Sequence, residues 1–239
     1  MKSLKILLIA SVCIILTSRV DAQFFRTVRG NGDVVKRERT VSSFDGIKVS
    51  TGIDVYLRQG DKESIAVEAD ENLHEYILTE VRDGVLHVYS EANIRDAKMR
   101  RVYVTMKEVK SLKTSSAGDI IGETPIKGDE IEIGASSAGD ISVEIYAKTL
   151  EVDISSSGDV KLSGEAETLN AELSSAGDLE AFGLKVKEAE VEVSSAGDAK
   201  LNVSERLVAR ASSAGDITYE GNPKYLDAHS SSAGGIHSR

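Results

Sequence analysis

Six aspartates recur along the second half of the chain, each directly after a glycine. They are Asp119, Asp140, Asp159, Asp178, Asp198 and Asp216. Carboxylate oxygens are ligands that Ca²⁺ prefers, so a fold that stacked these residues would create a candidate calcium ladder. The alternative is that each carboxylate accepts a hydrogen bond from a backbone N–H at a turn. Both interpretations require a fold that brings equivalent positions of a repeat together.

A site that cleaves polysaccharide is the second kind of chemistry to consider. Lyases and hydrolases of glycans use clustered carboxylates, and Arg206 and Arg210, near Asp198, are the closest approach to a basic residue beside such a cluster. The aspartates are equal members of a repeat, however, and the chain has no tryptophan to stack on a sugar. We therefore predict no catalytic residue and no cofactor, and a protein that is not an enzyme.

Histidine, serine and cysteine add no further site. None of the histidines at positions 74, 87, 229 and 237 pairs with another at metal-ligand spacing on one element. No base flanks a serine in a way that supports a Ser-His-Asp triad. Cys13 is the sole cysteine, so the chain beyond it has no thiol chemistry and no disulfide.

The elements that position the aspartates belong to an internal repeat, whose copies end at Asp119, Asp140, Asp159, Asp178, Asp198, Asp216 and Gly235. Each copy has the pattern Ser-Ser-Ala-Gly-Asp, with Ser157 in place of alanine in the third copy and Gly235 in place of aspartate in the last. The glycines are 21, 19, 19, 20, 18 and 19 residues apart. A constant period of this kind indicates stacked structural units.

Apolar and polar residues alternate between the copies, as in Leu150, Val152 and Ile154 before Gly158. This period of two is typical of half-buried strands, and one coil alone could not bury its apolar edge. We predict an all-β fold, a single-stranded parallel β-helix (solenoid) of roughly 19-residue coils, with a less regular β N-terminal part. Two packed antiparallel sheets are the alternative.

The same alternation assigns side chains to the inside or the outside of the coil. It predicts that the second serine and the glycine of each copy point inward, with a positive φ at the glycine. The serines of this expected internal ladder are Ser116, Ser137, Ser156, Ser175, Ser195 and Ser213. Outward positions hold Glu132, Glu144, Glu151, Glu172, Glu190 and Glu192, which predicts one acidic face.

The first 22 residues have the pattern of a secretory signal peptide. Lys2 and Lys5 precede an apolar run over residues 6–16, which is too short to span a membrane, and Ala22 ends a cleavage site. We further divide the chain into a flexible or edge segment (23–37), an irregular β part (38–110) and regular coils (111–239). Cleavage removes three positive charges and one negative charge, so the net charge changes from −10 to −12. An acidic protein repels phosphate backbones, which disfavours nucleic acid as a partner.

Four features together resemble the "putative auto-transporter adhesin, head GIN domain" family, a domain of unknown function in exported proteins of Bacteroidetes-type bacteria. They are Phe44-Asp45-Gly46-Ile47, Gly52-Ile53-Asp54-Val55, the stretch from Glu68 to Leu73, and the Ser-Ser-Ala-Gly-Asp copies. The resemblance covers about residues 38–239. It implies a β-helical fold and a location in the periplasm, at the outer surface or outside the cell, and it carries no catalytic motif to this chain.

Our functional hypothesis is an exported, non-enzymatic envelope protein that binds a protein or polysaccharide of the envelope or of a host surface through the faces of its coils. A polysaccharide lyase or hydrolase and a structural spacer are the alternatives. Because an open coil exposes unpaired backbone groups, we also expect self-association through the coil ends.

Overall fold

The computed structural model describes residues 26–239. The predicted signal peptide (1–22) lies outside the described residues. Within the described part, no helix has the length and apolarity needed to cross a membrane.

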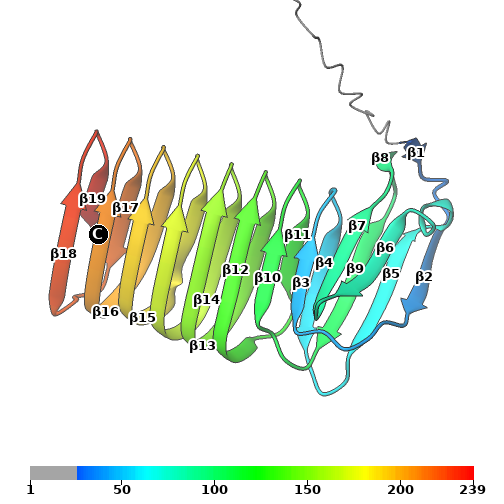
Figure 1. Cartoon of the computed structure of the whole chain (residues 1–239), viewed down its shortest axis with the longest axis horizontal. Coiled ribbons are helices and arrows are strands. Elements are labelled where there is room, and N and C mark those ends of the chain that lie inside the picture. Colours follow the sequence, from blue (N-terminus) through cyan, green and yellow to red (C-terminus); the bar gives the residue numbers. More distant parts are fainter. Residues whose placement is uncertain (1–25) are drawn as a thin grey trace, which may run out of the picture.

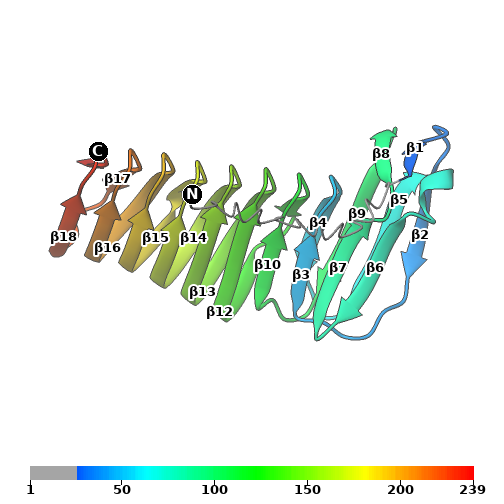
Figure 2. The same ribbon diagram turned by 45° about the horizontal axis from the view of Figure 1, so that its top comes forward.

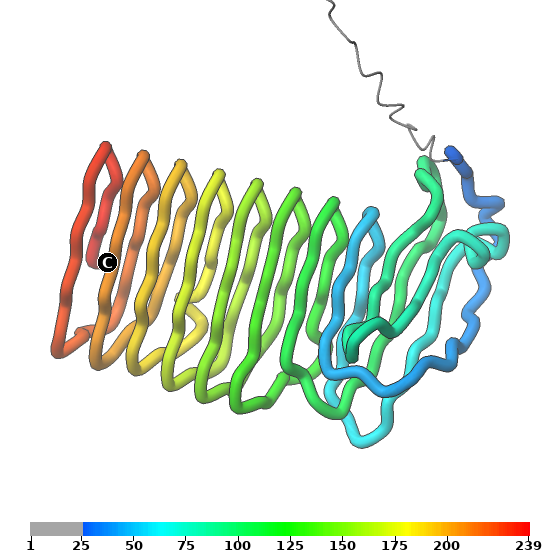
Figure 3. The backbone as a smooth tube through the Cα atoms, viewed as in Figure 1, coloured from blue at the N-terminus to red at the C-terminus, as the bar shows by residue number. Residues whose placement is uncertain are grey.

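The chain winds into a flattened parallel solenoid whose coils stack side by side (Figures 1 and 3). Each coil runs up one sheet, turns at a Ser-Ser-Ala-Gly corner, and descends in a second sheet; we call these the pre-corner and post-corner sheets. The strands of the array are β10 (Ser111–Thr114), β11 (Asp119–Gly122), β12 (Ile126–Ser136), β13 (Asp140–Ser155), β14 (Asp159–Leu173), β15 (Asp178–Val193), β16 (Asp198–Ala211), β17 (Asp216–Glu220), β18 (Tyr225–Ser230) and β19 (Gly235–Ser238). The predicted parallel β-helix is confirmed, and the alternative of packed antiparallel sheets is wrong.

Equivalent residues of successive coils pair in register. In the post-corner sheet Asp140 pairs with Asp159, and Asp159 with Asp178. In the pre-corner sheet Val152 of β13 pairs with Ile133 of β12 and with Ala171 of β14. Because strands in a sheet lie about 4.8 Å apart, any residue type that recurs in the repeat becomes a column along the solenoid.

The inward columns form one continuous apolar core between the two sheets. Alternate residues of each strand are buried, as in Leu150, Val152 and Ile154 of β13, each exposed by no more than 2%. One coil buries such a row against the coils on either side, so the core exists only in the stack. The inward and outward partition predicted from alternation holds along these strands.

The corner differs from the prediction in two respects. The second serine and the following residue of each copy form the tip of a two-residue turn and have φ between 49° and 64°, as at Ser175 and Ala176. Gly177 then donates its N–H to the Ser174 carbonyl oxygen at 3.2 Å. Each tip is also bonded to the next coil, as where the Ala176 N–H donates to the Ser195 carbonyl oxygen at 3.0 Å. Figure 2 shows these tips in a row along one edge of the solenoid.

The expected internal serine ladder is therefore wrong. Ser116, Ser137, Ser156, Ser175, Ser195 and Ser213 are exposed at the turn tips. The positive φ falls on them and on the next residue, and the glycine is needed for a different reason. A Cβ on Gly158 would lie 2.6 Å from the carbonyl carbon of Ala135, so the glycine permits two coils to approach closely.

The regular stack begins earlier than the predicted boundary at residue 111. Strands β3 (Gly46–Val49) and β4 (Asp54–Gln59) pair in parallel register with β10 and β11. Thr51 and Gly52 occupy the corner of this first coil, with φ of 62° and 65°. Residues 60–110 then leave the array and return, and they cover its first coil on the side away from β10.

The covering segment, which we call the cap (60–110), is the larger share of the predicted irregular β part (38–110). Strands β7 (Val85–Ser90) and β9 (Arg100–Met106) continue the two sheets in parallel, and β6 (Ile77–Arg82) and β5 (Ser64–Asp70) add antiparallel strands outside them. The short 3-10 helix η1 (Glu71–Leu73) connects β5 to β6. The change from parallel to antiparallel pairing ends the repeat at this side of the molecule.

Residues 23–37 were expected to be a flexible or edge segment. The described part, residues 26–37, lies at the edge of the structure. Strand β2 (Val34–Arg39) pairs antiparallel with β5 and is the outermost strand of the post-corner sheet, and β1 (Thr27–Arg29) pairs with β8 (Asn93–Asp96). Of the two alternatives, the edge is the one seen in residues 26–37.

Asp70, at the end of β5, connects β5 to two other segments of the chain through hydrogen bonds. Its buried carboxylate accepts hydrogen bonds from the backbone N–H groups of Gly32 (2.9 Å), Lys98 (3.1 Å) and Met99 (3.0 Å). Burial acts to raise the pKa of Asp70, but the three backbone donors outweigh it and leave the pKa below its usual value.

Candidate binding surface

The predicted aspartate column exists on the post-corner sheet, where register pairing places the six aspartates in one row. The row is longer than the repeat indicated, because Asp54 of the first coil pairs with Asp119. Arg101 lies beyond Asp54 at one end of the row, and Gly235 replaces the aspartate at the other. Asp54 was missed because its coil lacks the Ser-Ser-Ala-Gly sequence.

Backbone N–H groups donate hydrogen bonds to some of these carboxylates and so offset part of the repulsion between them. The N–H of Asp140 donates to Oδ1 of Asp119 at 3.3 Å, and the N–H of Asp198 donates to Oδ1 of Asp178 at 3.2 Å. Burial and the carboxylates of adjacent coils raise the pKa values of Asp119, Asp159 and Asp198. The hydrogen-bonding interpretation is thus observed at two coils.

The calcium ladder stays a prediction. Across residues 26–239, no three His, Cys, Asp or Glu side chains are grouped so that they could hold a metal ion. A calcium titration followed by thermal unfolding with and without chelator tests the ladder directly, because an ion that binds only the folded state raises its stability.

Replacing Asp159 by asparagine is expected to stabilise the protein at pH 7 by up to about 1 kcal/mol in dilute salt, because charges ~4.8 Å apart in water repel by ~0.9 kcal/mol and salt screens them. The raised pKa of Asp159 means that the folded state holds its proton more tightly than the unfolded state. The contribution of Asp159 to wild-type stability therefore becomes more favourable as the pH falls toward 3.8, and the advantage of the variant should disappear over that range.

Thermal unfolding at pH 7 and at pH 3.5–4 measures this change. The control is Asp129→Asn, which removes a carboxylate that pairs with Lys148 at 2.9 Å and should bring no gain. A loss of stability in Asp159→Asn at pH 7 would show that the carboxylate has a stabilising partner.

The constellation considered for a glycan-cleaving enzyme is not assembled. Asp198 lies in the post-corner sheet, and Arg206 and Arg210 lie in the pre-corner sheet, on the opposite side of the core. The Arg210 guanidinium pairs with Asp227 at 2.7 Å, and Arg206 lies over the ring of Tyr225. Closeness in sequence misled here because the chain changes sheets between these residues.

The acidic face lies on the pre-corner sheet. Five of the six outward glutamates predicted for one face are there, and Glu144 is the exception, because it precedes the bend and belongs to the post-corner sheet. A groove of about 510 Å³ follows this face beside the corners. We define the acidic groove by its lining acids Glu132, Asp153, Glu172 and Glu192, with Lys48 and Lys113 at one end.

Gly134 occupies one position of the row that lines the groove, between Lys113 and Asp153. It contributes no side chain, and the stem of Lys113 passes 3.4 Å from where its Cβ would lie. The first serine of each copy lines the side next to the corners, at Ser115, Ser136, Ser155, Ser174 and Ser194. The groove thus offers carboxylates and hydroxyls at intervals set by the coil spacing. Sequence alternation indicated the acidic face but could not show this hollow.

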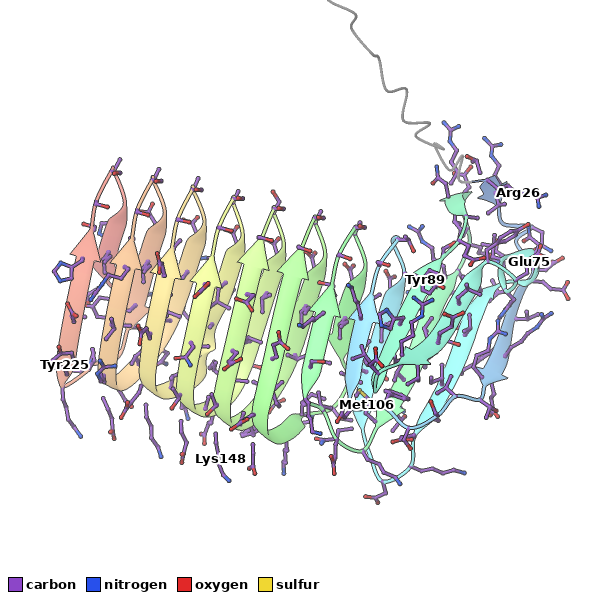
Figure 4. All side chains as sticks on the ribbon, viewed as in Figure 1. Arg26, Glu75, Tyr89, Met106, Lys148 and Tyr225 are labelled. Carbon is purple, nitrogen blue, oxygen red and sulfur yellow. The ribbon has the colours of Figure 1, made fainter. Side chains whose placement is uncertain are left out.

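The negative charge of the groove is compensated only in part, by Lys48 and Lys113 at one end and by Arg210, which pairs in register with Glu192 at the other. At several other positions a lysine pairs with an acidic residue of the preceding coil, as in Lys187–Glu167 (3.1 Å), Lys200–Glu180 (2.8 Å) and Lys148–Asp129 (2.9 Å). In Figure 4, Lys148 points away from the lower edge, among a row of long side chains. Among the described residues, Glu132 pairs with Lys113, whereas the ion pairs found there do not include Asp153, Glu172 or Glu192.

The stacked coils with an external groove define a β-solenoid protein with a surface suited to binding. Residues 43–223 match the family described as "Putative auto-transporter adhesin, head GIN domain", and the chain belongs to that family. The family is described as one of adhesins, not of enzymes, in agreement with the resemblance found in the sequence. No curated protein sequence matches the chain.

Solved structures share the fold. A putative adhesin from Bacteroides fragilis superposes with a TM-score of 0.83 at 22% identity, covering 89% of this chain and 100% of the other. A putative adhesin from Parabacteroides merdae gives a TM-score of 0.69 at 24% identity, covering 90% and 99%. A protein from Parabacteroides distasonis named as putative lipid binding gives 0.69 at 25% identity, covering 90% and 100%.

Proposed function

We propose that this protein is an exported, non-enzymatic adhesin-like protein that binds an extended cationic segment of a protein or polysaccharide along the acidic groove. Membership of an adhesin family supports the adhesive role. The observation that carries the proposal is a row of carboxylates along a groove. Asp153, Glu172 and Glu192 line the groove in successive coils, and the ion pairs among the described residues include none of the three.

An extended partner fits the geometry better than a compact one. The carboxylates recur once per coil, about 4.8 Å apart, so a chain with regularly spaced amino or guanidinium groups can meet several of them together. Complementary charge of this kind speeds encounter and sets the register of a partner. The serine hydroxyls on one side of the groove can accept or donate hydrogen bonds to a peptide backbone or a sugar.

The proposal predicts that neutralising the groove weakens binding of a cationic probe. With fluorescein-labelled octalysine as the probe, the triple variant Asp153→Asn, Glu172→Gln, Glu192→Gln should bind at least tenfold more weakly in dilute salt, measured by fluorescence anisotropy. Because exposed charges are screened by salt, binding by the wild type should weaken as salt is added.

A matched triple variant controls for net charge. Glu165→Gln, Glu167→Gln and Glu180→Gln remove the same number of carboxylates from positions that pair with lysines of the next coil. This control should change the affinity by less than twofold. Equal losses in both triple variants would show that octalysine responds to net charge alone, and would reject the groove as the site in favour of a structural spacer.

A further inference from the structure

The outermost strands at the two ends of the solenoid differ in charge. At the N-terminal end, antiparallel strands β2 and β6 are outermost, and β2 carries Lys36, Arg37 and Arg39. Charged side chains, especially lysine, on an edge strand oppose pairing with another chain. At the other end the outermost strands are β18 and β19, with the sequences Tyr-Leu-Asp-Ala-His-Ser and Gly-Ile-His-Ser, and neither contains lysine or arginine.

The last coil also exposes its core positions. Leu226 is 46% exposed although it pairs with Leu207, which is fully buried one coil earlier. Tyr225 is 53% exposed beside it, and Figure 4 shows it at the lower corner of this end. Two of the three large apolar residues exposed within residues 26–239 are thus in β18. An unguarded strand edge with apolar residues is a template for another strand.

We propose that β18 pairs antiparallel with β18 of a second copy of this chain, joining two solenoids end to end about a twofold axis. A twofold interface brings the same surface of each copy together, so β18 of one copy meets β18 of the other. The guarded N-terminal end then lies at both outer ends of the dimer, so assembly stops at two copies.

Side-chain parity selects the register. Residues directly opposite each other in antiparallel strands lie on the same face of the sheet, so the axis passes through a residue. An axis at Asp227 would place two carboxylates opposite each other, which is unfavourable. An axis at Ala228 places Asp227 of each copy opposite His229 of the other. The Asp227 carboxylate already contacts Arg210 and His229 of its own chain, so the junction gathers two carboxylates, two imidazoles and two guanidinium groups. The same axis places Leu226 opposite Ser230 on the core side.

Charge along the post-corner sheet fits the same arrangement. The aspartate column ends one coil early, because Gly235 stands where the repeat has aspartate. With aspartate at that position, each copy would bring the end of its negative column to the junction. The imidazole of His237 and the carboxylate of Asp216 occupy the space where a Gly235 side chain would lie.

Cysteine cross-linking tests both the pairing and its register. Residues 23–239 contain no cysteine, so single cysteines can be placed in the chain that lacks residues 1–22. Under mild oxidation, Asp227→Cys mixed with His229→Cys should give several-fold more disulfide-linked dimer than either variant alone. Asn170→Cys, on the same sheet in the middle of the array, is the control and should give only background.

Sedimentation of the wild type gives the independent measurement. We expect a concentration-dependent dimer of the wild type. Leu226→Lys places a lysine on the edge strand, which opposes strand pairing, and should give a monomer. Because Leu226 is already 46% exposed, the melting temperature of this variant should be nearly unchanged. A monomeric wild type at several hundred micromolar would overturn the proposal. Preferential cross-linking of Asp227→Cys with itself, or a dimer without cross-linking in any mixture, would overturn the register at Ala228.

Discussion

Replacing Asp70 by asparagine is expected to lower the free energy of unfolding by about 3 kcal/mol, because each buried donor left without a good acceptor costs ~1–3 kcal/mol. The carboxylate accepts hydrogen bonds from the backbone N–H groups of Gly32, which precedes the first coil, and of Lys98 and Met99, which belong to the cap (60–110). An asparagine retains one acceptor oxygen and turns an NH₂ group toward the remaining donors. Chemical denaturation of both proteins at pH 7 measures the difference.

Asp96→Asn provides the matched control within the same cap. Asp96 forms an exposed ion pair with Arg29 at 3.3 Å, and exposed pairs contribute about 0–1 kcal/mol. A loss of stability in Asp70→Asn as small as that in Asp96→Asn would contradict the prediction. It would mean that the hydrogen bonds to Asp70 are not what holds β5 to the neighbouring segments.

The stabilisation by Asp70 should also depend on pH in a defined direction. Because hydrogen bonds hold the pKa of Asp70 below its usual value in the folded state, the ionised group stabilises the fold above pH 3.8. That contribution is lost as the pH falls below 3.8 toward the folded-state pKa. The difference in free energy of unfolding between wild type and Asp70→Asn should therefore narrow on acidification below pH 4. The contribution of Asp159, whose pKa is raised, changes in the opposite direction, because it becomes more favourable as the pH falls.

Replacing Gly164 by alanine is expected to cost about 2–6 kcal/mol, the sum of backbone strain of about 1–3 kcal/mol and overpacking of about 1–3 kcal/mol. Gly164 has φ of 110°, and a Cβ built on it would lie 2.1 Å from the carbonyl oxygen of Ile145 in the preceding coil. That oxygen belongs to the backbone of a packed strand and cannot rotate away. The measurement is the change in denaturant midpoint.

Gly32→Ala separates the two contributions. Gly32 also has a positive φ, 81°, but nothing lies within 4 Å of a Cβ built there. Its substitution should cost only about 1–2 kcal/mol, as expected for strain without a clash. If both variants lost the same stability, backbone conformation alone would explain the effect, and the close approach of coils at Gly164 would be relaxed without cost.

Residues in the repeat allowed most of the fold to be predicted. A constant period with strands of alternating polarity has few solutions that bury the apolar rows, so the solenoid and the outward position of Asp119 and its equivalents followed from local pattern. The outward position of Glu151 and Glu172 followed in the same way, because alternation of side chains is a property of any strand.

Other features depended on the tertiary structure. Alternation separates inside from outside but cannot tell which of two sheets a residue joins, since that depends on where each coil bends. For this reason Glu144 and Arg210 were assigned to the wrong neighbours. The coil at Thr51 and Gly52 has no Ser-Ser-Ala-Gly sequence, and a 51-residue cap (60–110) separates it from the next coil, so only backbone pairing between β3 and β10 reveals that it begins the stack.

The acidic groove shows the same division. The sequence by itself determined that carboxylates recur on the outer surface and that the protein is acidic. Only the stacked structure decided that a groove runs beside some of them, and that Asp153, Glu172 and Glu192 stand in one row along it, outside the ion pairs of the described residues. The physical reason is that a column forms between residues about 19 apart in the chain, so its charge balance depends on register between coils and on no local pattern within one coil.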